Sequence, residues 1–129
     1  MRFIKVKNDF KIIKIADISY GVGKSASGND QLRSKWANKD DYWFHLDGNK
    51  SSHVIVKLSG QQLSTEVINT AATLVAHFSQ FKDEWIPIIF TQVKNLKGIT
   101  GTPGMVIYKK EKHLSCPKII LDQSIKEGL

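Results

Sequence analysis

The alternation of apolar and polar positions predicts several short strands. Charged and apolar residues alternate over residues 2–7, as in a half-buried strand, and residues 10–15 form its expected partner across a turn at 8–9. Residues 42–47 and 52–58 form a second expected pair. Further strands are expected at 86–92, 105–110 and 114–121. Because it is rich in glycine, the segment 20–25 is expected to be a loop.

Two helices interrupt these strands. A long amphipathic helix is expected over about 64–81, where Ser64 is a suitable N-cap and apolar residues recur with helical spacing. A short helix is expected over about 29–36, where Leu32 and Trp36 share one face. Since strands outnumber helices and several are joined directly, the expected fold class is α+β with a mixed, mainly antiparallel sheet.

Length and composition indicate an ordinary globular chain. The 129 residues fit one domain over 1–129, with 41% hydrophobic and 24% charged residues. No apolar run is long enough to span a membrane, and charges interrupt the first residues where a signal peptide would need an apolar core. We therefore expect a cytoplasmic protein without membrane contact. The single cysteine, Cys116, cannot form an internal disulfide.

The charge balance favours a polyanionic partner. Nineteen Lys and Arg residues against twelve Asp and Glu residues give a net charge of +7. Such an excess attracts nucleic acid, although many basic proteins bind no specific anion. The segment Gly23-Lys24-Ser25 is not a nucleotide-binding P-loop, because Ile18 stands where that motif requires its first glycine. Lys24 and the glycine-rich turn could still hold one backbone phosphate.

The strands 42–47 and 52–58 predict a polar constellation. The register that matches their apolar sets places His45 opposite His53 and Trp43 opposite Ile55. One face then carries the side chains Trp43, His45, Asp47, His53 and Lys57.

Several interpretations of this face stay open. In a metal site the nearby lysine would oppose the cation, and in an acid–base site no activated nucleophile is evident. As a nucleic-acid surface, the tryptophan would stack on a base while the histidines and the lysine meet phosphates or base edges. Alternatively, the long helix covers the face and these residues only bond to one another inside the fold.

Five segments, in order along the chain, resemble the motifs of the NFACT RNA-binding domain family. They match its G-[RK]-x-A-x-x-N-D, D-x-W-x-H, S-H-V, V-K-x-x-K and P-G-x-V-x-Y patterns. The matching segments are Gly23–Ala26 with Asn29-Asp30, Asp40–His45, Ser52–Val54, Val93–Gly98 and Pro103–Tyr108.

The resemblance implies an RNA-binding module. In larger relatives this module accompanies other domains, in proteins that act with tRNA on stalled large ribosomal subunits. The N-terminal region and coiled coil of those relatives are not found in these 129 residues. We therefore predict backbone binding of structured RNA, either tRNA or rRNA, without a metal or cofactor. The residues expected to contact RNA are Lys24, Arg33, Trp43, His45, His53, Lys57, Lys94 and Lys97.

Two other functions remain open at this point. One is a nucleic-acid-processing enzyme that uses His45, His53 and Asp47. The other is a protein-interaction module that docks on an acidic, ribosome-associated partner. Because no nucleophile or metal motif stands out, a binding function is favoured over catalysis.

Overall fold

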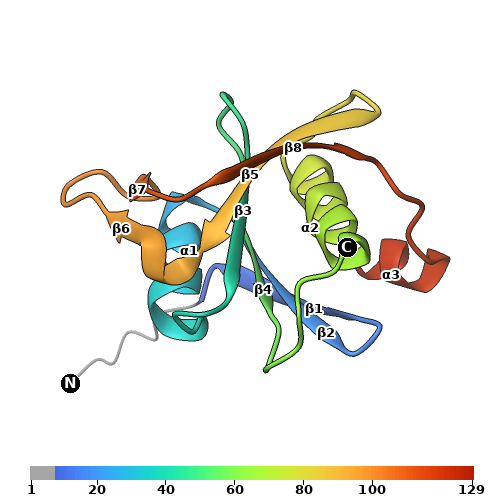
Figure 1. The fold of residues 1–129 in the computed structure, drawn as a ribbon, viewed down its shortest axis with the longest axis horizontal. Helices are drawn as coiled ribbons and strands as arrows, with labels where there is room; N and C mark the ends of the chain where they lie inside the picture. The colour runs from blue at the N-terminus through green and yellow to red at the C-terminus, as the bar shows by residue number, and fades with distance from the viewer. Residues whose placement is uncertain (1–7) are drawn as a thin grey trace, which may run out of the picture.

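A computed structural model describes residues 8–129 and confirms the α+β class (Figure 1). Six antiparallel strands form one sheet in the order β1-β2-β4-β3-β5-β8, and β6 pairs with β7 in a separate ribbon. The strands are β1 (Phe10–Ile15), β2 (Ile18–Gly23), β3 (Tyr42–Leu46), β4 (Val54–Lys57), β5 (Trp85–Gln92), β6 (Leu96–Gly98), β7 (Val106–Tyr108) and β8 (Lys112–Pro117). The helical elements are α1 (Ala26–Gln31), η1 (Leu32–Trp36), α2 (Thr65–Phe78), η2 (Val93–Asn95) and α3 (Gln123–Gly128).

The long helix α2 covers one face of the sheet (Figure 1). Its predicted N-cap is confirmed, because the Ser64 hydroxyl accepts a hydrogen bond from the Val67 amide at 3.2 Å. The helix ends at Phe78, three residues before the predicted end. Leu74 and Val75 are fully buried in the core between α2 and the sheet. No helix in the described part of the chain is long and apolar enough to cross a membrane.

The opposite face carries α1, η1 and the β6–β7 ribbon (Figure 1). The short helix begins at Ala26 rather than near residue 29, because Ser25 caps it by accepting from the Gly28 amide at 3.0 Å. Its continuation η1 is a π-helical turn. A second apolar cluster lies beneath these elements and consists of the buried residues Leu32, Trp43, Ile55 and Ile89.

The glycine-rich segment 20–25 was wrongly predicted to be a loop. Residues 20–23 belong to β2, which pairs with β1 across a turn at Ala16 and Asp17, both with positive φ. The predicted partner strand 2–7 lies outside the described residues. Gly21 faces the second cluster, where an added Cβ would lie 2.4 Å from Leu32 Cδ1. Glycine is therefore needed at this position to let η1 approach the strand closely.

Replacing Gly21 by alanine is expected to lower the free energy of unfolding by about 1–3 kcal/mol, because the added methyl group overpacks the contact with η1. Urea denaturation measures the effect. Gly128→Ala is the matched control, because an added Cβ meets no atom within 4 Å there. Equal stabilities of the two variants would contradict this account of the contact.

Candidate nucleic-acid interface

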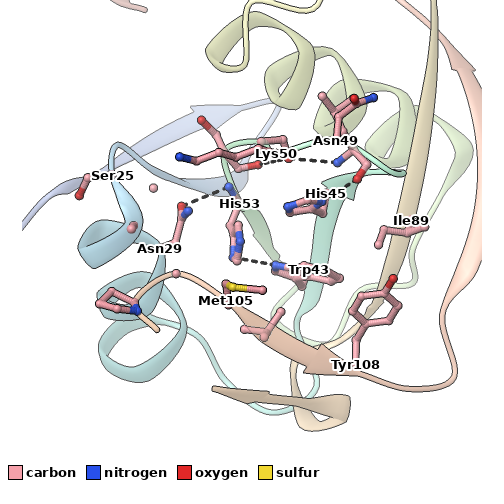
Figure 2. A pocket seen from close by; sticks show the side chains of 18 of the residues that line it. Ser25, Asn29, Trp43, His45, Asn49, Lys50, His53, Ile89, Met105 and Tyr108 are labelled. Carbon is pink, nitrogen blue, oxygen red and sulfur yellow. Dashed lines mark hydrogen bonds between the residues drawn. The ribbon is translucent and has the colours of Figure 1, made fainter. Parts of the chain in front are cut away.

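A cavity of about 820 Å³ opens on the sheet face opposite α2 (Figure 2). Its floor comes from β3 and β5, and its walls come from three connecting segments. These are the end of β2 with the start of α1, the loop between β3 and β4, and the loop that leads into β7. The cavity therefore gathers residues that lie far apart in the sequence.

His45 and His53 lie side by side in this cavity, as the predicted register requires (Figure 2). The recorded pairing of Trp43 with Ile55 confirms that register. The two imidazole rings meet edge to face, with their centroids 5.1 Å apart. The alternative in which the long helix covers them is wrong, because α2 packs on the other face. Its second part holds for His53, which is buried and hydrogen-bonded to Trp43 within the fold.

Hydrogen bonds determine which nitrogen of each ring carries the proton. Trp43 Nε1–H donates to His53 Nδ1 at 3.0 Å, so this nitrogen is an acceptor and the neutral ring is protonated at Nε2. His45 Nδ1 lies 2.6 Å from the Leu46 carbonyl oxygen, which only accepts, so Nδ1 is the donor there. Neutral His45 therefore has a lone pair on Nε2, and neutral His53 has a proton on Nε2.

Both imidazoles are held in their neutral forms. Burial is the main cause that lowers the pKa of His53 to about 3, with smaller contributions from His45 and Arg33, opposed by Asp30. Burial also lowers the pKa of His45, against a smaller opposing effect of its bond to Leu46. At neutral pH these rings therefore supply hydrogen-bonding groups and no positive charge.

The mouth of the cavity supplies positive charge instead. Lys24 and Lys50 line it and are exposed. Among the described residues that line it, none is an aspartate or glutamate. The amides of Gly23 and Lys24 already donate to the carbonyl oxygens of His53 and Asp9. The lysine side chains, and not these amides, are therefore available to bind an anion. This rim is therefore complementary to an anion.

An aspartate attaches one wall of the cavity to α1. Asp30 Oδ2 accepts from the Gly104 amide at 2.9 Å, and its other oxygen pairs with Arg33 at 3.1 Å. Gly104 has a φ of +81°, and an added Cβ would lie 2.8 Å from the Ala26 Cα atom. This backbone contact sets the position of the segment that leads into β7.

The structure separates the predicted contact residues into two groups. Lys24, Trp43, His45 and His53 line the cavity. The remaining residues, Arg33, Lys57, Lys94 and Lys97, do not. The sequence predicted RNA contacts for all eight, and the cavity contains only half of them.

Three expected roles need correction. Trp43 is only 1% exposed, so it supports the cavity floor and presents no face on which a base could stack. Lys57 Nζ donates to the Trp36 carbonyl at 2.8 Å and lies 4.3 Å above the Trp36 ring, so its charge is used within the protein. Arg33 is likewise paired, with Asp30.

Lys94 and Lys97 are exposed outside the cavity. Lys94 Nζ lies 3.5 Å from Asp40 Oδ1, and Lys97 belongs to β6. Sequence reasoning missed several lining residues that the folded chain adds. These are Asn29, Lys50, Met105 and Tyr108, of which all but Lys50 belong to the family-like segments.

Asp47 does not join the two histidines in the cavity. Its carboxylate lies 2.9 Å from His113 Nδ1, and it is not a lining residue. Among the described residues 8–129, no group of three His, Cys, Asp or Glu side chains could hold a metal ion. The catalytic constellation considered from the sequence is therefore not assembled here.

Comparison with known proteins assigns the family. The model of the NFACT protein RNA binding domain matches residues 10–110. The chain belongs to this family. Its curated relatives include the Rqc2 homolog RqcH of Bacillus subtilis, 34% identical over 70% of this chain, and that of Streptococcus suis, 36% identical over 72%. The chain spans only 16–17% of the length of these two relatives.

A solved structure has the same fold. The C-terminal part of the fibronectin/fibrinogen-binding protein from Streptococcus suis aligns with a TM-score of 0.80 and 28% identity, over 98% of this chain and 51% of that one. Four of the five family-like segments meet at the cavity, through Gly23–Ala26 with Asn29, Trp43 with His45, Ser52 with His53, and Pro103–Val106 with Tyr108. The fifth, Val93–Gly98, does not line it.

Proposed function

We propose that this chain is a single RNA-binding domain that binds tRNA or rRNA in ribosome-associated quality control. Membership of the NFACT RNA-binding family supports RNA as the ligand, and the similarity to RqcH proteins supports the ribosomal setting. A cytoplasmic location accords with that setting. The observation that carries the proposal is the convergence of four family-like segments on one cavity, whose described lining residues include Lys24 and Lys50 but no carboxylate.

The lysines at the mouth supply much of the affinity in this proposal. Lys24 and Lys50 meet backbone phosphates, while exposed Lys94 and Lys97 extend the contact outside the cavity. Each phosphate that a lysine neutralises releases condensed counterions from the nucleic acid. Affinity therefore decreases steeply with salt concentration.

The double variant Lys24→Gln/Lys50→Gln is expected to bind tRNA about tenfold or more weakly at 0.1 M salt, because two phosphate contacts are lost. The slope of log affinity against log salt should decrease in magnitude by about 2. Fluorescence anisotropy with labelled tRNA and rRNA fragments measures both quantities. It also determines which of the two RNAs the domain prefers.

The control is Lys14→Gln/Lys126→Gln, which removes the same charge from exposed positions that do not line the cavity. It should leave the salt slope close to that of the unmodified protein. If both variants weaken binding equally, net charge and not this cavity determines the affinity. Wild-type binding that does not respond to salt would refute the proposed function.

A further inference from the structure

We propose that the cavity receives the base of one unpaired RNA nucleotide, while the flanking phosphates lie at Lys24 and Lys50. This inference rests on the proposed function and specifies which part of an RNA the site recognises. It follows from the apolar walls of the cavity, from its hydrogen-bonding groups and from the charge at its mouth.

The walls of the cavity expose apolar side chains, which a ligand consisting of sugar and phosphate alone would not require. Met105 is 55% exposed and Tyr108 is 39% exposed, and both line the cavity beside the buried Trp43 (Figure 2). Thioether and aromatic side chains pack well against the flat face of a base. The volume of about 820 Å³ lies within the range of small-molecule sites, about 300–1,000 Å³. The cavity therefore has room for one nucleotide.

The paired histidines provide one acceptor and one donor. The lone pair on His45 Nε2 can accept a base N–H, and the proton on His53 Nε2 can be donated to a ring nitrogen or carbonyl. The hydrogen bonds that these two rings make with other described residues use their Nδ1 atoms, so the Nε2 atoms are available to a ligand.

This donor–acceptor pair explains why the nucleotide must be unpaired. Every base has a donor beside an acceptor on its Watson–Crick edge, and in a duplex that edge is already occupied by the opposite base. The cavity therefore selects unpaired nucleotides while it tolerates all four bases. Because both rings are neutral, they recognise the base edge, and the lysines recognise the phosphates.

The positions of the surrounding elements fit a base inside the cavity and phosphates at its mouth. Lys24 follows β2 on one wall, Lys50 lies in the loop between β3 and β4, and Met105 precedes β7. The bond from the Gly104 amide to Asp30 sets the position of the Met105 wall relative to α1. A base enters between these walls while its backbone stays at the mouth.

The test uses the 129-residue protein and three RNAs with equal numbers of phosphates. They are a hairpin with an unpaired loop, the same hairpin with abasic loop residues, and a blunt duplex. Since stacking contributes roughly 1–3 kcal/mol per base, the hairpin should bind about ten- to a hundredfold more tightly than the other two. Adenosine monophosphate supplies one base and one phosphate without flanking nucleotides. It should therefore compete with the hairpin for the protein only at far higher concentration.

The variant Met105→Ala/Tyr108→Ala removes the two exposed apolar walls. It should bind the hairpin and the abasic hairpin equally, with duplex affinity unchanged. Ile107→Ala is the matched control from the same strand, because Ile107 is 60% exposed and does not line the cavity. Thermal unfolding of each variant checks that the fold is retained.

The outcomes separate this inference from the proposed function. Equal, salt-dependent binding of all three RNAs would overturn base capture and leave RNA binding intact. No binding of any RNA would refute both. Adenosine monophosphate that binds as tightly as the hairpin would replace the RNA assignment by a free-nucleotide site.

Discussion

Replacing Trp43 by alanine is expected to lower the free energy of unfolding by about 3–5 kcal/mol. The indole is 1% exposed and packs with Leu32, Ile55 and Ile89 in the cluster beneath η1. Its removal leaves a void under the cavity floor and deprives His53 Nδ1 of its donor.

Urea denaturation at pH 7 measures this effect. Trp43→Phe is the informative comparison, because it keeps most of the buried apolar volume but cannot donate to His53. We expect it to recover more than half of the lost stability. A loss below about 1 kcal/mol in Trp43→Ala would contradict a supporting role, since a solvent-exposed stacking residue has little effect on stability.

Stability is expected to decrease as the pH falls below about 6.5, by up to about 1.4 kcal/mol per pH unit from His53 alone. In the unfolded chain this imidazole takes up a proton near its ordinary pKa of 6.5, whereas in the folded protein its pKa is about 3. Acid therefore favours the unfolded state throughout that interval, and the full stability is present above pH 6.5. At pH 5 the expected loss is about 2 kcal/mol. His45 acts in the same direction, because burial lowers its pKa also.

Urea denaturation at pH 7, 6 and 5 gives this dependence. His53→Asn keeps an acceptor for the Trp43 indole and cannot titrate, so its stability should change less over the same interval. The quantity compared is the slope of the free energy of unfolding against pH. A constant loss of stability caused by the smaller side chain does not change this slope. Identical slopes in the two proteins would mean that His53 is protonated as easily in the folded state as in the unfolded one.

The sequence by itself determined the local elements and much of one strand pairing. Ser64 predicted the start of α2 because a hydroxyl at that position satisfies a free amide of the first turn. The apolar sets of β3 and β4 predicted the pairing of Trp43 with Ile55, since a shift of one residue would reverse every side chain. The same reasoning placed His45 opposite His53.

The role of the glycine-rich segment followed from tertiary contacts. Gly21 and Gly23 belong to β2 through its pairing with β1, and they are glycines because η1 and Asn29 approach the strand closely. Composition alone contains no information about such a contact. Local pattern predicts loops wherever glycine gathers. A strand that another element approaches closely also contains several glycines, because a side chain would not fit between the two backbones.

Only the tertiary structure decided which charges and rings are available at the cavity. The sequence predicted that eight residues contact RNA, yet Lys57 is bound to Trp36 and Trp43 is buried beneath the cavity. Lys50 and Met105 come from two separate loops that line the same cavity. A sequence pattern predicts which side of a strand a residue occupies. Burial and pairing with other side chains depend on elements distant in the chain, and they decide whether a residue is available to a ligand.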